Sequence, residues 1–98
     1  MTDRRIVITG IGVISPLGND LASTWEAMKA GRSGIDTIKS MDVTGYSTKI
    51  AGEVKDFDPA PYFKTPKDAR RVDRFTHFAM GAAGMALKDS GLDLAAGD

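Results

Sequence analysis

Four basic side chains recur at helical spacing in the last third of the sequence. They stand at i, i+3, i+4 and i+7 and are Lys67, Arg70, Arg71 and Arg74. On one helix they would fall within about a third of the circumference. Arginine forks bind carboxylates through paired hydrogen bonds, so the spacing is typical of an anion-binding face. A solvated charged face, partnered by neighbouring aspartates, gives the same pattern.

The position of these cations in the predicted helix favours an anionic partner. All four would occupy its first two turns, where the helix macrodipole disfavours positive charge by about 0.3–1 kcal/mol per residue. A bound anion would offset that cost.

Other catalytic and metal-binding groups are scarce. The chain has no cysteine and one histidine, His77, which excludes a thiol nucleophile and histidine-based metal clusters. The serines Ser15, Ser33 and Ser90 lack a G-x-S-x-G setting. We therefore predict no catalytic residue, no metal site and no cofactor site in this chain, and we interpret His77 as a packing or surface residue.

Composition narrows the classes of partner. Thirteen basic and thirteen acidic side chains give a net charge of zero, which argues against bulk nucleic-acid binding. No apolar run approaches the ~20 residues of a membrane span, and the apolar stretch near the N-terminus is too short for a secretory signal. The absence of cysteine fits a cytoplasmic protein.

A glycine-rich turn follows the first apolar run. Residues 4–9 contain consecutive β-branched side chains, which predict a buried central strand. Gly10 and Gly12 fit the first two positions of a dinucleotide-binding fingerprint, but the third position falls on Ser15. The turn is longer than that fingerprint allows, so we predict a scaffold turn that packs closely.

The first helix is predicted over about 20–30, capped by Asn19 or Asp20 and stopped by Gly31. Leu21, Trp25 and Met28 form one apolar stripe, in which Trp25 is interpreted as a core anchor. Residues 32–64 are loop-rich, with a short strand around Thr48–Val54.

A second, longer helix should begin after Thr65, with Pro66 at its first position, and end at Ser90-Gly91. Its apolar seam, spaced 3, 4, 3 and 4, comprises Val72, Phe75, Ala79, Ala82 and Ala86. Gly81 and Gly84 inside this helix each cost roughly 1 kcal/mol relative to alanine. We therefore expect another backbone to approach this small-residue face.

These elements do not complete a domain. A strand that is apolar on both faces expects neighbours on both sides, and the sequence offers none. We interpret residues 1–98 as an incomplete domain: a fragment, or one chain of a larger assembly.

Four motifs, taken together in order, resemble the N-terminal portion of a β-ketoacyl-carrier-protein synthase of the elongating type. They are T-G-x-G-x-x-S-P-x-G-N from Thr9, A-G-x-S-G-I from Ala30, K-I-A-G-E-V-K-D-F-D from Lys49 and A-R-R-V-D-R-F-T-H-F-A from Ala69. The last belongs to a segment similar to the family pattern K-x-x-R-R/K-x-D-x-F, whose basic residues dock the acidic carrier protein. The resemblance gives that docking role to Lys67, Arg70 and Arg71, and also to Arg74.

The resemblance implies an α/β fold with thiolase-like α/β/α/β/α layers, of which this chain supplies the first core strand and early helices. It implies fatty-acid elongation by a cytoplasmic homodimer whose acyl and malonyl groups ride on the phosphopantetheine of acyl carrier protein, without a diffusible cofactor. The family's nucleophilic cysteine and catalytic histidines are absent here. This chain alone is therefore expected to be inactive.

Two alternatives remain open from the sequence. One is a ketosynthase subunit of an aromatic polyketide system, which shares the opening motif. The other is a non-enzymatic module that only binds a carrier protein. Continuation of the parent gene past Asp98 into a cysteine-bearing segment would favour an enzyme over a binding module.

Overall fold

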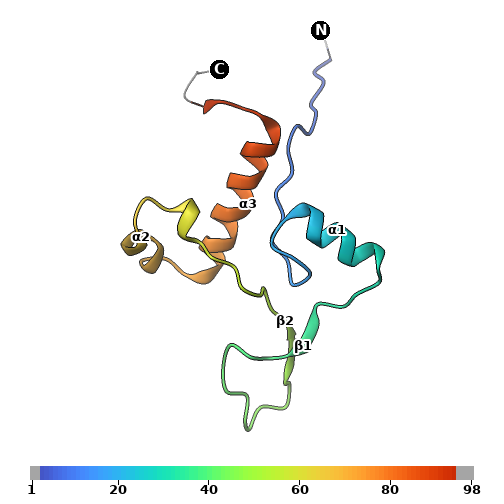
Figure 1. Ribbon diagram of the computed structural model, residues 1–98, viewed down its shortest axis with the longest axis vertical. Coiled ribbons are helices and arrows are strands. Elements are labelled where there is room, and N and C mark those ends of the chain that lie inside the picture. Colours follow the sequence, from blue (N-terminus) through green and yellow to red (C-terminus); the bar gives the residue numbers. More distant parts are fainter. Residues whose placement is uncertain (1–2, 95–98) are drawn as a thin grey trace.

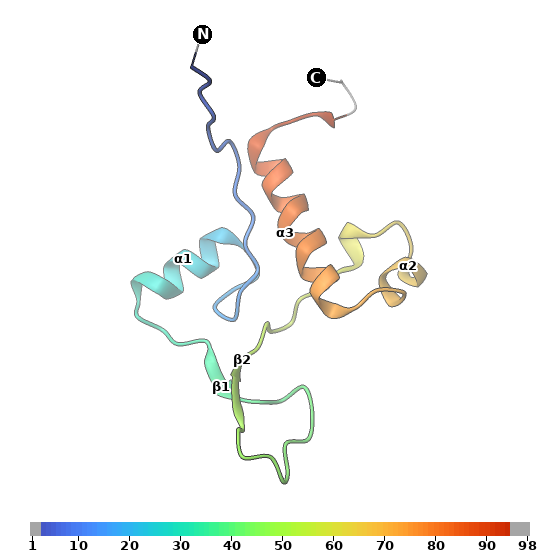
Figure 2. The same cartoon turned by 180° about the vertical axis from the view of Figure 1, so that it is seen from behind.

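The computed structural model describes residues 3–94, which extend over 60 × 37 × 26 Å. The helices are α1 (Leu21–Lys29), α2 (Pro66–Arg70) and α3 (Arg74–Ser90), with a 3₁₀ turn, η1, at Ala60–Tyr62. The strands are β1 (Ile35–Thr37) and β2 (Ile50–Gly52). The N-terminal segment runs beside α3, and α1 and α2 lie on opposite sides of this pair (Figures 1 and 2).

Residues 4–9 are extended but form no strand, so that prediction was wrong for this chain. Ile6 is 91% exposed and Ile8 85% exposed. A strand exists only through hydrogen bonds to a neighbour, and no other segment of residues 3–94 pairs with this one. The apolar run that indicated a buried strand therefore lies open to solvent.

The turn that follows packs tightly against α3. A Cβ on Gly10 would collide with the carbonyl oxygen of Ala86, and a Cβ on Gly12 with that of Ala82. The predicted close backbone approach to the small-residue face of this helix is confirmed. The glycines that permit it lie on the approaching segment, because only a residue without Cβ lets its backbone come this near.

Gly81 and Gly84 serve a different purpose from the one predicted. A Cβ on Gly81 would lie 2.6 Å from Ile14 Cδ1, and a Cβ on Gly84 would lie 2.8 Å from Tyr62 Cδ1. Side chains, and no second backbone, fill the space that these two glycines leave.

Helix α1 confirms the predicted bounds and caps. Asp20 Oδ1 accepts hydrogen bonds from Ser23 N at 2.8 Å and Ser23 Oγ at 2.6 Å, and Gly31 ends the helix with φ of 70°. The hydrogen bonds from the Ser23 hydroxyl and amide hold the pKa of Asp20 below its ordinary value.

The predicted apolar stripe of α1 faces solvent. Trp25 is 54% exposed and Met28 57% exposed, so Trp25 is no core anchor within residues 3–94. Thr24 and Ala27 are the buried residues of α1. Thr24 Oγ1 lies 2.9 Å from Ser15 Oγ and ties the helix to the glycine-rich turn.

A short antiparallel hairpin lies within residues 32–64, which are otherwise loop-rich as predicted. β2 lies within the strand expected around Thr48–Val54, and its partner β1 was not predicted. Ile35 pairs with Gly52, and Thr37 pairs with Ile50. Three residues in each strand are too few for period-two alternation to be recognised in the sequence.

The helix predicted from Pro66 to Ser90 is two helices, so that prediction was wrong in its middle. Helix α2 ends at Arg70 and is capped by Arg71, whose N–H donates to the carbonyl of Asp68. Helix α3 begins at Arg74 and its N-cap is Asp73, whose backbone is extended (φ −77°, ψ 165°). Aspartate favours such an N-cap position over a helix interior. Val72 therefore leaves the apolar seam, and Phe75 is 72% exposed.

Phe57 supplies the main apolar contact of α3. The residue is 8% exposed. Its ring meets Phe78 edge-on at 5.9 Å between centroids and stacks on Tyr62 at 6.0 Å. This cluster anchors the segment between the hairpin and α2 to α3.

Candidate functional site

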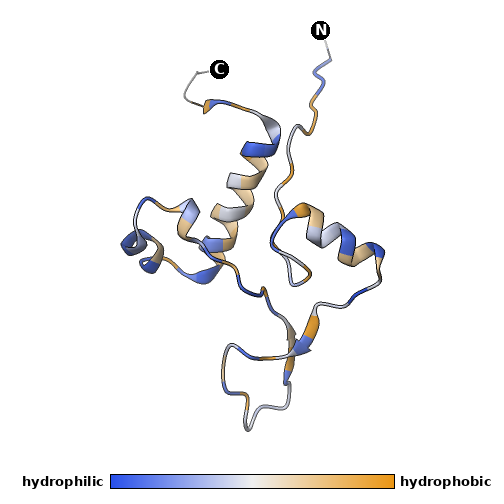
Figure 3. Ribbon diagram, viewed as in Figure 1, coloured by the Kyte–Doolittle hydropathy of each residue, from blue (hydrophilic) through white to orange (hydrophobic). Residues whose placement is uncertain are grey.

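Helix α2 presents the predicted basic residues, and its start agrees with the sequence. Thr65 Oγ1 accepts a hydrogen bond from Asp68 N at 3.2 Å, and Pro66 occupies the first turn. Ala69 is 8% exposed and faces the molecule. The ribbon of α2 is coloured mainly as hydrophilic (Figure 3).

Three of the four predicted docking residues are exposed and unpaired. Lys67, Arg70 and Arg71 form no ion pair within 4.0 Å and no side-chain hydrogen bond with any part of residues 3–94. Lys64, three positions before Lys67, is exposed and unpaired as well. Lys64 was not among the predicted docking residues, although its spacing of three from Lys67 indicates a shared surface. We call Lys64, Lys67, Arg70 and Arg71 the α2 basic surface.

The break before α3 changes the electrostatic argument. Arg70 is the last residue of the five-residue helix α2, where a helix dipole favours cations, whereas Lys67 is its second residue. The prediction that all four cations oppose one dipole was wrong, because it assumed one continuous helix. An anionic partner is still suggested by the exposed, unpaired cations themselves.

Arg74 belongs to α3 and its guanidinium has partners within the chain, so the grouping of four residues on one helical face was wrong. Its Nη2 donates to the carbonyl oxygen of Phe57 at 2.9 Å. Its guanidinium lies 5.0 Å from the ring centroid of Phe78 and 5.6 Å from that of Phe57. Arg74 begins α3, whereas Lys67 and Arg70 belong to α2, and its guanidinium turns toward the aromatic cluster.

His77 is a packing residue, as predicted, and its hydrogen bonds fix its tautomer. Nε2 lies 2.7 Å from the carbonyl oxygen of Ala69, which can only accept, so Nε2 carries the proton. Nδ1 then accepts from Arg74 Nη1 at 3.2 Å. The ring also meets Phe63 edge-on at 5.6 Å. No local pattern indicates the carbonyl partners at Phe57 and Ala69, because they lie 17 and 8 residues away from the groups that bind them.

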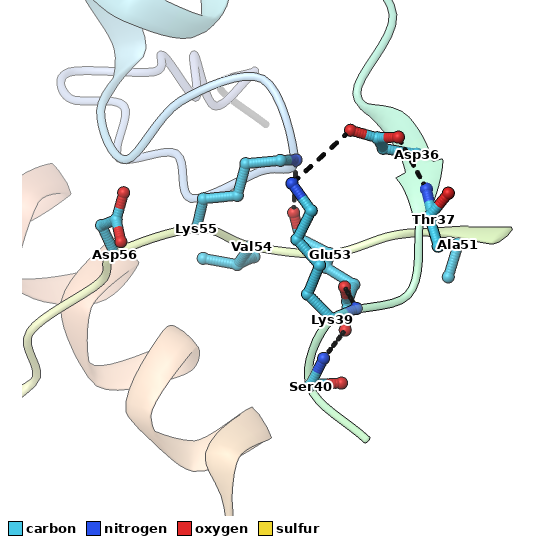
Figure 4. A pocket seen from close by; sticks show the side chains of 9 residues that line it. All are labelled: Asp36, Thr37, Lys39, Ser40, Ala51, Glu53, Val54, Lys55 and Asp56. Atoms are coloured by element: carbon cyan, nitrogen blue, oxygen red, sulfur yellow. Dashed lines mark hydrogen bonds and ion pairs between the residues drawn. The ribbon is translucent and has the colours of Figure 1, made fainter. Parts of the chain in front are cut away.

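A hollow of about 370 Å³ beside the hairpin is a second candidate site (Figure 4). Two of its charged groups, Glu53 and Lys55, are already engaged. Glu53 accepts from the backbone N–H of Lys39 at 2.8 Å and of Ser40 at 3.3 Å. Hydrogen bonds from the Ser40 side chain, the larger effect, and from the Lys39 backbone hold the pKa of Glu53 below its ordinary value. Lys55 Nζ donates to the carbonyls of Glu53 (3.0 Å), Pro16 (3.2 Å) and Gly34 (3.4 Å).

These contacts make the hollow a structural junction between the hairpin and the glycine-rich turn. Within residues 3–94 no group of three or more histidine or acidic side chains is arranged to hold a metal ion. No helix in the same range is long and apolar enough to cross a membrane.

Comparison with known proteins gives concordant matches. Residues 3–98 match the family model described as "Beta-ketoacyl synthase, N-terminal domain". The chain is 47% identical over 94 residues to 3-oxoacyl-(acyl-carrier-protein) synthase 2 of Vibrio harveyi, covering 96% of this chain and 22% of that protein. Its identity to the protein of the same name from Coxiella burnetii is 48%, with the same coverage. The chain thus spans about a fifth of the length of these relatives.

A solved structure titled "The ishigamide ketosynthase/chain length factor" is similar in fold. It superposes with a TM-score of 0.82 at 38% sequence identity, over 94% of this chain and 23% of that chain. The helices, the small sheet and the connections between them therefore follow the α/β architecture of a ketosynthase, as the sequence resemblance implied.

Proposed function

Because this chain belongs to the β-ketoacyl synthase family, we propose that it forms the N-terminal part of a 3-oxoacyl-(acyl-carrier-protein) synthase that elongates fatty acids. Within that enzyme it would supply scaffold and part of the surface that receives acyl carrier protein. The observation that carries the proposal is the α2 basic surface, whose cations have no partner within residues 3–94.

In the complete enzyme the chemistry would occur outside this chain. An acyl group would pass from its carrier thioester to a cysteine thiolate, releasing the carrier thiol. Malonyl-carrier protein would then lose CO₂ beside two histidines. The resulting carbanion would attack the acyl-cysteine carbonyl and expel the thiolate. The present sequence contains none of these catalytic residues. It has no cysteine, and its single histidine, His77, is hydrogen-bonded to the carbonyl of Ala69.

Carrier docking is the step to which this chain would contribute directly. An acidic carrier protein would be attracted to exposed cations that have no internal partner. Such attraction acts mainly on encounter and weakens with salt, because the screening length is about 8–10 Å at physiological ionic strength.

We further propose that the whole enzyme is a cytoplasmic homodimer.

The test is charge reversal on the complete synthase. Arg70→Glu combined with Arg71→Glu should raise the Michaelis constant for acyl carrier protein, and the salt dependence of that constant should fall. Turnover of a small acyl thioester without a carrier should change little. The matched control is Arg32→Glu, compared with each single variant, because Arg32 is an exposed arginine. It follows α1 in the sequence, and α1 and α2 lie on opposite sides of α3 (Figures 1 and 2).

Two results would contradict the docking proposal. If the double variant handled both substrates like the parent enzyme, the α2 basic surface would be only a solvated face. If it lost both activities together, the arginines would be structural.

A second candidate function is a ketosynthase subunit of a polyketide system. The observation that favours it is the structural similarity to a ketosynthase/chain length factor pair. The two candidates differ in product: a fatty-acid synthase would release a 3-oxoacyl chain after one condensation, whereas a polyketide subunit would require a second, partner chain and add several malonyl units. Mass spectrometry of carrier-bound products separates them.

A further inference from the structure

The short helix α2 depends on other parts of the chain for its orientation. It contains five residues, far fewer than the ~12–15 that an isolated helix needs even to be marginally stable. The backbone of residues 71–73 that connects it to α3 is not helical. Its placement must therefore come from side-chain contacts.

One hydrogen-bonded chain supplies such contacts. Arg74 Nη2 holds the carbonyl of Phe57 at 2.9 Å, and Arg74 Nη1 donates to His77 Nδ1 at 3.2 Å. His77 Nε2 in turn donates to the carbonyl of Ala69 at 2.7 Å. We call this chain of contacts the Arg74–His77 bridge. It joins the Phe57 segment, α3 and α2.

The contact at Ala69 replaces a backbone hydrogen bond. In a continuous helix the carbonyl of Ala69 would accept from the N–H of Asp73, four residues later. The break at Asp73 frees that carbonyl, and the imidazole of His77 takes it. The bond therefore satisfies the end of α2 and fixes its direction relative to α3.

We propose that Arg74 and His77 are positioning residues for carrier-protein docking: the Arg74–His77 bridge holds α2 at the angle that presents Lys67, Arg70 and Arg71 together. This inference rests on the proposed carrier docking. It also assigns Arg74 a role through the bridge in place of the direct contact that the sequence suggested. Only the neutral tautomer with the proton on Nε2 completes the bridge, because Arg74 requires an acceptor at Nδ1.

The test compares two His77 variants in the complete synthase. His77→Leu keeps the volume and removes both hydrogen bonds. His77→Gln keeps one amide N–H for Ala69 and one carbonyl oxygen for Arg74. We expect His77→Leu to raise the Michaelis constant for acyl carrier protein by about two- to ten-fold, which corresponds to the loss of the one hydrogen bond that reaches α2, at the carbonyl of Ala69. We expect His77→Gln to stay within about twofold of the parent by the same reasoning.

Two further readouts separate positioning from general damage to the fold. The rate on a small acyl thioester should be unchanged in both variants. Amide hydrogen exchange in a peptide covering residues 65–73 should accelerate in His77→Leu and be restored in His77→Gln. Arg74→Met, which keeps the aliphatic stem over the rings, should reproduce the effect of His77→Leu.

The outcomes distinguish the two proposals. If charge reversal at Arg70 and Arg71 weakens carrier use but His77→Leu and Arg74→Met do not, the positioning proposal is wrong and docking stands. If charge reversal at Arg70 and Arg71 has no effect, the docking proposal is wrong. Faster amide hydrogen exchange of residues 65–73 in His77→Leu would then show only that the Arg74–His77 bridge stabilises the fold. If His77→Leu lowers the rate on the small thioester as much as on the carrier substrate, positioning of α2 is also refuted.

Discussion

Replacement of Gly12 by alanine should destabilise this fold through one steric contact. A Cβ at Gly12 would overlap the carbonyl oxygen of Ala82 and lie 2.7 Å from Ala86 N and 2.9 Å from the carbonyl carbon of Ala82. All of these atoms are backbone atoms of the 17-residue helix α3. Gly12 does not have a positive φ, so the backbone conformation itself accepts alanine and the cost is packing alone.

The expected magnitude follows from the stiffness of the neighbours. Inserting a methyl group into a packed contact costs about 1–3 kcal/mol, and more where the surroundings cannot shift. At Gly84 the same methyl group would meet only the ring of Tyr62, at 2.8 and 2.9 Å. A half-buried ring can move, and alanine stabilises a helix interior by about 1 kcal/mol relative to glycine. The two effects at Gly84 nearly cancel.

The assay is urea unfolding of the complete synthase carrying either substitution. Gly12→Ala should lower the free energy of unfolding by about 1–3 kcal/mol or more, whereas Gly84→Ala should lie within about 1 kcal/mol of the parent. The slope of the unfolding free energy against urea concentration should be unchanged if both variants unfold in the same way. A Gly12→Ala protein as stable as Gly84→Ala would refute the close approach of the N-terminal segment to α3.

Two further predictions concern α1 and the chemistry of the chain. Asp20→Ala should lower the urea midpoint of unfolding near pH 7. The folded state depresses the pKa of Asp20, so the ionised carboxylate stabilises the fold above the unfolded pKa of about 3.9. That stabilisation is lost as the pH falls through the lower pKa of the folded state. The difference should therefore shrink below about pH 4, while Asp20→Asn keeps a cap at every pH; a constant difference would contradict the charged cap. Separately, the 98-residue chain, having no cysteine, should form no acyl adduct with acyl carrier protein in intact-mass spectrometry, and an adduct on any residue would disprove this.

The caps and the family were readable from the sequence because their signals are local or ordered along the chain. Asp20 and Thr65 each accept a hydrogen bond from a residue three positions later. Gly31 and Gly91 end their helices with φ of 70° and 71°. These interactions depend on a few adjacent residues, so residue type and spacing are sufficient to identify them.

Tertiary structure decided what helical periodicity could not. The spacing of Lys67, Arg70, Arg71 and Arg74 suits one continuous helix, but the chain breaks at Asp73 and sends Arg74 to Phe57, 17 residues away. The strand expected over residues 4–9 depends on neighbours that residues 3–94 do not provide. Periodicity records which residues could share a face. Whether they do is set by distant hydrogen-bond acceptors and packing partners, whose positions are fixed only when the chain has folded.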